Sequence, residues 1–387
     1  LAQSLLPAGK ALFICCEDIF QPYGNKILSR LSGAGYAVIK HIFKGNILPD
    51  IKHCDILSAL PEDIRLVICF GGGAVSDIVK YFCFNRGIKL IIIPSAPAAI
   101  GHLSNYSGLF FEGVKQYVPS IPPDILLCDL TVAANVPQEM IAAAFGELCS
   151  MLTVLFDLYY AKVIFGGHYC ENIADMLFQV IDMCINEGEG LKAKQSGSVY
   201  ILTEALLRCS LCIQMLQGGS LISSPFYAAD IFSFYSKNFL YGESVFIMHQ
   251  KLFSLYKLFL ENDFSGDILP PADKAAHARR LSEIFGLDYY RTLPKMRYDA
   301  SVKTYMVTKY KIEEYRGDLL HFLDGINQKV EKTAMVFKRI YQDAGYQFSQ
   351  KLKNADAISA LALACDFNDL PCLLSYMRTG GFFEKYI

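Results

Sequence analysis

Short apolar runs and amphipathic stretches alternate through the first third of the chain. Runs rich in Ile, Val and Leu predict strands at 11–16, 37–40, 64–69 and 88–94. Apolar residues at helical spacing predict helices at 23–32, within 47–60 and at 74–86. A hairpin at 110–117 and a strand at 125–129 complete this part. Because strands that alternate with helices pair in parallel, the pattern predicts an α/β domain with a parallel Rossmann-like sheet.

From residue 136 onward the pattern is that of helices without strands. The predicted helices lie at 140–162, 173–186, 199–217, 231–239, 245–261, 272–285, 303–310, 319–345 and 355–364. The Gly- and Ser-rich stretch 218–225 is expected to be a loop. We therefore predict two domains, a nucleotide-binding α/β domain at 1–135 and an all-helical domain at 136–387.

A glycine triplet, Gly71-Gly72-Gly73, separates the predicted strand 64–69 from the helix 74–86. Glycine lets the backbone approach a ligand because no Cβ stands in the way. A helix that begins at such a turn presents free N–H groups and the positive end of its dipole to one point. The turn therefore predicts a site for a pyrophosphate, although a tight strand-to-helix turn without a ligand explains the glycines equally well.

The composition narrows the classes of partner. Hydrophobic residues make up 53% of the chain and charged residues 19%, and the formal net charge is −2. This charge gives no reason to expect nucleic acid or an anionic membrane as a partner. The most apolar stretch, 151–165, is interrupted by Asp157 and Lys162, so no membrane span is predicted. The apolar excess indicates a thick core or a buried subunit interface, and hence a homo-oligomer.

The thirteen cysteines are scattered through apolar segments without the spacing of a zinc site. An odd total argues against a disulfide framework. We interpret them as reduced core thiols of a cytoplasmic protein.

Five motifs, taken in order, resemble the superfamily of iron-containing alcohol dehydrogenases, glycerol-1-phosphate dehydrogenases and dehydroquinate-synthase-like cyclases. They are Gly71-Gly72-Gly73 with Asp77 and Lys80, Ile93-Pro94-Ser95-Ala96-Pro97, the run 123–129, Phe145-Gly146-Glu147, and Tyr241-Gly242-Glu243-Ser244-Val245. The segment 94–104 looks most like the glycerol-1-phosphate dehydrogenase branch. The resemblance implies a dehydroquinate-synthase-like fold, with the helical domain carrying the metal and substrate side of a cleft.

By this resemblance, Gly71, Gly72 and Gly73 hold the pyrophosphate of NAD or NADP, together with Asp77 in the following helix, and Ser95 contacts the cofactor. Glu17, just after the first strand, is a candidate acceptor for the adenosine ribose hydroxyls. A carboxylate there favours NAD over NADP because it repels a 2′-phosphate. The resemblance also places a basic group at Lys115, where it would bind a phosphate or acid on the substrate.

The same families hold a divalent metal, zinc or iron, with one carboxylate and two histidines. Glu147 stands at the carboxylate position, but Tyr241 and Asp230 stand where the histidines are expected. For the second of these, an ungapped match gives Ala228 instead of Asp230. Ile100 replaces a substrate-side Asp. The nearest histidines, His102 and His249, are alternatives for a rearranged site; Glu147, Asp230 and Tyr241 together would make an all-oxygen site suited to a harder ion.

Three functions remain open at this stage. The first is an NAD-dependent oxidoreductase acting on a polyol or polyol phosphate with a divergent metal site. The second is a cyclase of the dehydroquinate-synthase kind; the presence of Glu147 and Lys115 favours this interpretation. The third is a cofactor-binding protein without turnover, because the aliphatic side chain of Ile100 cannot polarise a hydroxyl.

Overall fold

The structure of the chain is a computed structural model that describes residues 9–45, 47–111, 114–217, 223–236, 238–264, 302–342, 354–364 and 372–383. It divides into two compact units. Unit 1 consists of Leu1–Ala144 and Ala193–Leu221, and unit 2 of Phe145–Lys192 and Ile222–Ile387. The segment 193–221 belongs to unit 1 because its helix, α10 (Ser196–Gln217), packs against α6 (Leu130–Ala134) and the 3-10 turn Ile100–Leu103. The domain limits 1–135 and 136–387 stay a prediction.

Unit 1 contains the expected parallel sheet, which confirms the predicted fold class for this part of the chain. Its strands are β1 (Lys10–Cys16), β2 (Ala37–Phe43), β3 (Leu66–Gly71), β4 (Lys89–Pro94) and β7 (Ile125–Leu126), in the order β2-β1-β3-β4-β7. All four pairings are parallel. The predicted hairpin is present as the antiparallel pair β5 (Tyr106–Phe111) and β6 (Val114–Pro119).

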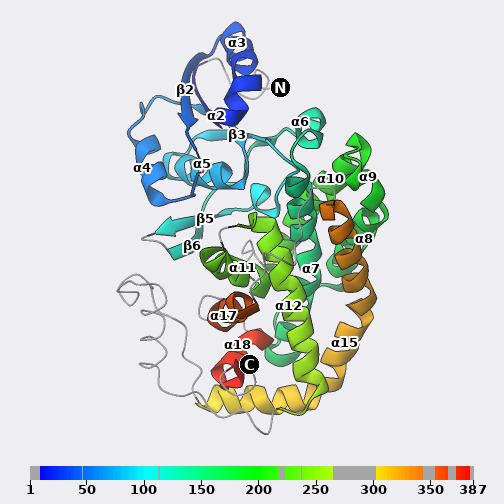
Figure 1. Cartoon of the computed structure of the whole chain (residues 1–387). Helices are drawn as coiled ribbons and strands as arrows, with labels where there is room; N and C mark the ends of the chain where they lie inside the picture. Colours follow the sequence, from blue (N-terminus) through cyan, green and yellow to red (C-terminus); the bar gives the residue numbers. More distant parts are fainter. Residues whose placement is uncertain are drawn as a thin grey trace. The chain divides into compact units, whose positions relative to one another are not determined.

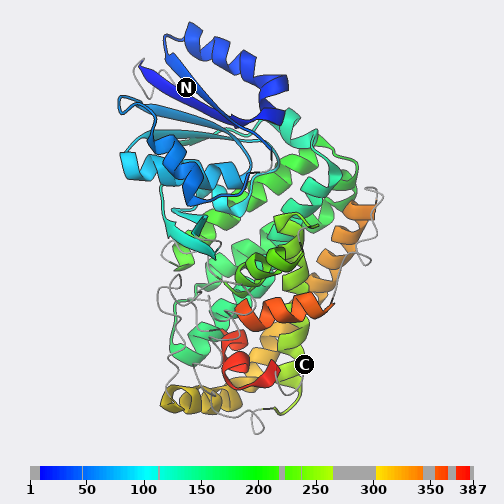
Figure 2. The same ribbon diagram turned by 60° about the vertical axis from the view of Figure 1, so that its left-hand side comes forward.

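Helices cover both faces of this sheet (Figures 1 and 2). Alternate residues of β1 and β3 point to opposite faces. Leu12, Ile14, Val67 and Cys69 pack with α4 (Ile51–Ser58) and α5 (Gly73–Arg86). Phe13, Ile68 and Phe70 face the other way and pack with α3 (Asn25–Gly33). Between β1 and α3 lie a short helix, α2 (Glu17–Ile19), and a π-helical turn, Phe20–Gly24.

Unit 2 is helical, and no strand occurs in the part of it that the structure describes, which confirms the predicted all-helical class. Its elements are the greater part of α7 (Gln138–Phe165), followed by α8 (Glu171–Asn186), α9 (Gly188–Lys192), α11 (Ser224–Tyr235), α12 (Tyr241–Glu261), α15 (Val302–Gln342), α17 (Asn354–Ala364) and α18 (Leu373–Thr379). The helices predicted at 303–310 and 319–345 are one helix, α15, because Gly317 continues the helix instead of ending it. The helix predicted at 272–285 lies outside the described residues.

Helix α11 begins at Ser224, seven residues before the predicted start at 231, so that prediction was wrong at its boundary. Pro225 occupies the first turn, where its missing N–H costs nothing. The backbone N–H of Ser224 donates to Oδ2 of Asp157 at 3.0 Å. Asp157 comes from α7, so only the tertiary structure supplies the acceptor that starts α11 at this residue.

Asp157 is the centre of a buried polar cluster in unit 2. Its Oδ1 accepts a hydrogen bond of 3.0 Å from the hydroxyl of Tyr256, and that hydroxyl is also 3.0 Å from Oγ of Ser224. Asp157 and Ser224 have no exposed surface. Burial without a cation raises the pKa of Asp157 from 3.8 to about 7.

This raised pKa makes the stability of the fold depend on pH. Between about pH 4 and 7 the Asp157 carboxyl holds a proton in the folded chain but not in the unfolded chain. The free energy of unfolding therefore falls as pH rises toward 7, by at most about 1.4 kcal/mol per pH unit. Relative to Asp157→Asn, which keeps the cluster uncharged, we expect the wild type to lose stability from pH 5 to 7, and we expect this loss to level off toward pH 8, where the carboxyl is ionised in both the folded and the unfolded chain. Urea unfolding midpoints at pH 5, 6, 7 and 8 measure this, and parallel profiles would contradict it.

Two of the described helices are long and apolar enough to cross a membrane, α7 and α10. In the most apolar window of α7, 89% of the residues are buried inside the structure, and in that of α10, 56% are buried. The core helices of globular proteins pass the same test, so this is weak evidence for a membrane span. The twelve cysteines that the structure describes are all free thiols, as expected.

Candidate functional site

The glycine triplet lies at the carboxyl end of β3, where ligands of parallel sheets bind. Gly71 ends the strand, Gly72 precedes α5 in an extended conformation, and Gly73 is the first helical residue. No side chain caps this helix terminus. The N–H groups of its first turn are therefore available to an anion.

The protein itself does not require glycine at two of the three positions. A Cβ at Gly71 would lie 3.0 Å from Cβ of Val75, which is tighter than most real contacts. A Cβ at Gly72 would have only Oγ of Ser95 at 3.9 Å, and one at Gly73 would meet nothing within 4 Å. None of the three has a positive φ. A tight turn therefore explains the glycine at position 71 but not those at 72 and 73. Close approach of a ligand would explain Gly72 and Gly73.

Ser95 and Glu17 lie at the same edge of the sheet. Ser95 follows β4, and its N–H donates to the carbonyl of Gly71 at 3.2 Å. Ser95 is nearly buried beside Gly72. Glu17 begins α2 directly after β1 and is exposed. The arrangement brings Ser95 next to the glycines, and the contacts of both residues with a cofactor stay predictions.

Lys80 has a structural role in α5. Its ammonium group is fully buried and donates to the carbonyl oxygens of Gly101 at 2.8 Å and Tyr106 at 2.7 Å. Oδ1 of Asp77, one turn earlier, lies 3.4 Å away. Burial lowers the pKa of Lys80, and the carboxylate of Asp77 acts against this shift. Lys80 thus ties the segment after β4, where Ile100 lies, to the helix of the glycine loop.

Lys115 on β6 belongs to the same cluster. A Cβ on Gly108 of β5 would lie 2.6 Å from Cε of Lys115, so the lysine stem runs directly over that glycine. Its Nζ lies 5.4 Å from the centre of the Tyr117 ring, and its charge acts on Asp77. The hairpin therefore holds the Lys115 ammonium close to the acid on α5, four residues after Gly73.

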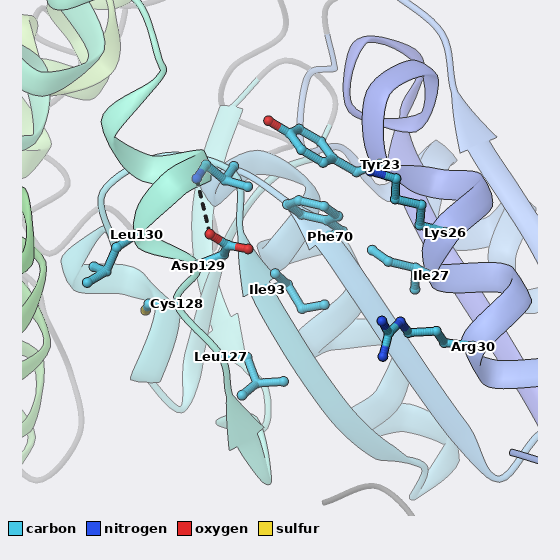
Figure 3. A pocket seen from close by; sticks show the side chains of 11 residues that line it. Tyr23, Lys26, Ile27, Arg30, Phe70, Ile93, Leu127, Cys128, Asp129 and Leu130 are labelled. Carbon is cyan, nitrogen blue, oxygen red and sulfur yellow. Dashed lines mark hydrogen bonds between the residues drawn. The ribbon is translucent and has the colours of Figure 1, made fainter. Parts of the chain in front are cut away.

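A pocket of about 670 Å³ opens beside the glycine loop on the face of the sheet that carries α3 (Figure 3). Its walls are apolar and aromatic side chains with basic residues at one side. It is lined by Tyr23, Lys26, Ile27, Arg30, Phe70, Ile93, Leu127, Cys128, Asp129, Leu130 and Val132. This pocket was not predicted from the sequence. The available signal was the placement of Lys26 and Arg30 one turn apart in the first predicted helix after the first strand.

The candidate metal ligands all belong to unit 2. Glu147 on α7, Asp230 on α11 and Tyr241 at the start of α12 are each half-buried. A Cβ on Gly146 would lie 2.5 Å from the carbonyl oxygen of Gly242, so α7 and α12 touch beside Glu147 and Tyr241. Within the described residues, no three His, Cys, Asp or Glu side chains are placed to share a metal ion. The residues present therefore do not fit a site of two imidazoles and one carboxylate; the all-oxygen site, which needs Tyr241, stays a prediction.

The two histidines considered as substitutes are both inside the fold. His249 has no exposed surface, and its Nδ1 is 2.7 Å from Oγ1 of Thr153 on α7. Burial lowers the pKa of His249 to about 3. His102 accepts the backbone N–H of Ala99 through Nδ1 at 2.8 Å, and burial with the nearby Lys80 lowers its pKa to about 4. Both rings are neutral at pH 7, and in each the Nδ1 atom is already engaged in a hydrogen bond inside the fold.

Comparison with known families agrees with the motifs. Residues 3–137 match the family model of iron-containing alcohol dehydrogenases. A glycerol-1-phosphate dehydrogenase [NAD(P)+] of Bacillus licheniformis is 31% identical over 212 residues, which cover 54% of this chain and 53% of that protein. The enzyme of the same name from Bacillus subtilis is 23% identical over 297 residues, covering 73% and 72%. The chain spans about half the length of the first of these curated relatives.

Solved structures share the fold. An iron-containing alcohol dehydrogenase from Thermococcus thioreducens superposes with a TM-score of 0.60 at 13% identity, covering 99% of this chain and 94% of that one. A glycerol dehydrogenase from Schizosaccharomyces pombe gives 0.55 at 18% identity, covering 88% and 86%. The comparisons confirm the superfamily resemblance and the fold expected from the sequence.

Proposed function

We propose that this chain, a relative of the iron-containing alcohol dehydrogenase superfamily in sequence and fold, is an NAD(P)-dependent oxidoreductase acting on a polyol phosphate. The observation that carries the proposal is the open glycine turn at the carboxyl end of β3. Neither backbone conformation nor packing requires glycine at Gly72 and Gly73. A diphosphate bound against the first turn of α5 would explain the two glycines, because any side chain at these positions would occupy the place of the diphosphate.

The proposed substrate class, a polyol phosphate, rests on Lys115. An ammonium group held over Gly108 and beside Asp77 is pre-positioned, so little conformational entropy is lost when it binds an anion. A phosphate ester of a polyol carries such an anion. The names of the curated relatives, glycerol-1-phosphate dehydrogenases, agree with this class of substrate.

The reaction proposed is oxidation of a carbinol of the substrate to a carbonyl: the carbinol carbon gives a hydride to the nicotinamide ring, and the hydroxyl gives its proton to water. In this chain the glycine turn would bind the diphosphate, Ser95 would contact the cofactor beside it, and Lys115 would orient the substrate through its phosphate. We derive no step through a metal ion, because the donors present do not match the site that the resemblance implies. The apolar composition supports assembly with further copies of the chain.

The test of this proposal is substrate-dependent formation of NADH or NADPH, with glycerol 1-phosphate as the first substrate. We expect Lys115→Met to raise KM roughly 10- to 100-fold, because a hydrogen bond to a charged group contributes about 1.5–3 kcal/mol. The dissociation constant of the cofactor should stay unchanged. The matched control is Lys89→Met, at the amino end of β4, whose exposed pair with Asp124 contributes little. An equal KM in both variants would contradict the role of Lys115.

A second candidate is a cofactor-binding protein that has lost turnover. Ile100, at the position where the resemblance implies a substrate-side acid, is buried, and the described residues contain no typical metal cluster. Retained cofactor binding without any NAD(P)H formation, also after addition of zinc or iron, would favour this candidate. The cyclase alternative predicts no net NAD(P)H, so accumulation of the reduced cofactor excludes it.

A further inference from the structure

The pocket beside the glycine loop has the composition of a site for a flat ring that carries an anion. Phe70 and Tyr23 lie in its wall with ring centroids 5.8 Å apart. Leu127, the first residue after β7, also borders the pocket, and 40% of its surface is exposed. Its volume of about 670 Å³ is within the range of sites for small ligands.

Two cations of α3 border this pocket at i and i+4, Lys26 and Arg30. In Figure 3 the Arg30 guanidinium extends from α3 over the sheet, and Lys26 lies beside Tyr23. Neither forms an ion pair within the part of the chain that the structure describes. The only acid in the lining, Asp129, directs Oδ1 to the backbone N–H groups of Thr131 and Val132.

This arrangement is unfavourable for the helix itself. Like charges at i and i+4 repel, and α3 contains no acid that would compensate. A bound anion would turn this repulsion into two favourable interactions, which is the physical reason to expect a ligand here.

The position of the pocket identifies that ligand. Phe70 is followed directly by Gly71, so the pocket continues from the proposed diphosphate site along the same strand. In a dinucleotide the adenosine is attached to the diphosphate, and its purine is a flat ring that stacks on aromatic side chains. The adenosine of NAD has no further negative charge, whereas that of NADP carries a 2′-phosphate.

We propose that this pocket binds the adenosine of the cofactor, and that Lys26 and Arg30 bind a phosphate on its ribose 2′ oxygen, so that the protein prefers NADP to NAD. The inference rests on the proposed function. It is opposite to the preference for NAD expected from Glu17, an exposed residue that does not line the pocket. Selectivity between the two cofactors decides between these expectations.

The experiment is titration calorimetry of the full chain with NADP, NAD, adenosine 2′,5′-bisphosphate and adenosine 3′,5′-bisphosphate. We expect NADP to bind at least about tenfold more tightly than NAD, and the 2′,5′ compound more tightly than the 3′,5′ isomer. Lys26→Gln and Arg30→Gln should each weaken NADP binding about tenfold and change NAD binding less than about twofold. The control is Lys52→Gln on α4, which covers the opposite face of the sheet and should change neither.

The outcomes distinguish failure of the 2′-phosphate site from failure of the proposed oxidoreductase function. Equal binding of NAD and NADP, or of the two bisphosphates, overturns the 2′-phosphate site and leaves the oxidoreductase proposal in place. Loss of NADP binding in Lys52→Gln as well would show general electrostatic attraction and would also overturn it. If neither dinucleotide binds the wild type, the proposed function fails together with the inference.

Discussion

Replacing Gly72 with Asp is expected to weaken binding of NAD or NADP by on the order of 100-fold, about 2.7 kcal/mol. The new carboxylate would stand at the first turn of α5, where it repels the diphosphate and fills its place. The substitution should not harm the fold, because the added Cβ has only Oγ of Ser95 near it, at 3.9 Å. Asp is also a favourable N-cap residue, so α5 should be as stable as before or slightly more so. Titration calorimetry measures the affinity, and urea unfolding measures the stability.

The matched control for this result is Gly197→Asp. Gly197 also lies in the first turn of a helix, α10, and a Cβ there meets nothing within 4 Å. We expect this variant to bind the cofactor as the wild type does. Unchanged affinity in Gly72→Asp, with an intact fold, would remove the basis for the diphosphate site and with it the proposed oxidoreductase.

Replacing Gly146 with Ala is expected to destabilise unit 2 by about 3 kcal/mol. The added Cβ would lie 2.5 Å from the carbonyl oxygen of Gly242 and 3.0 Å from Cβ of Phe246. Neither atom is the end of a flexible side chain, so α7 and α12 must move apart. Phe246 also stacks on Phe337 of α15 with ring centroids 3.8 Å apart, so the shift would disturb a third helix. The midpoint of urea unfolding, followed by circular dichroism, should fall.

Gly317→Ala is the control for this prediction. Gly317 is exposed within α15, and a Cβ there meets nothing within 4 Å. The same change of residue should therefore stabilise the helix by up to about 1 kcal/mol. If both alanine variants shifted the unfolding midpoint equally, close contact between α7 and α12 could not be the cause.

The local pattern of the chain was sufficient for most elements of unit 1. Residues 64–69 and 88–94 have the runs of Ile, Val and Leu that are typical of buried strands, and the glycine triplet marks the start of the next helix. In the structure Gly71 and Ser95 lie together, because neighbouring parallel strands end at one edge of the sheet. The boundary of α11 was not predictable in this way, since its first N–H binds Asp157, 67 residues earlier in the chain.

The pocket beside α3 was likewise not predictable from local sequence patterns. Its lining comes from the turn before α3, from α3 itself, from β3 and β4, and from the segment after β7. No local motif connects these segments, so their proximity, such as that of Arg30 and Leu127, was not predictable from the sequence. For Lys115, in contrast, the resemblance indicated a basic group, and the structure added that Gly108 leaves room for its stem.

By itself the sequence determined the fold class, the superfamily resemblance and the position of the glycine turn, because these depend on residue type and spacing within short segments. Only the tertiary structure decided that His249 is hydrogen-bonded through Nδ1 to Thr153, which lies 96 residues earlier, and that Lys26 and Arg30 border an open pocket. The physical reason is that burial, hydrogen-bond partners and electrostatic surroundings are set by side chains from distant segments, and spacing along the chain carries no record of them.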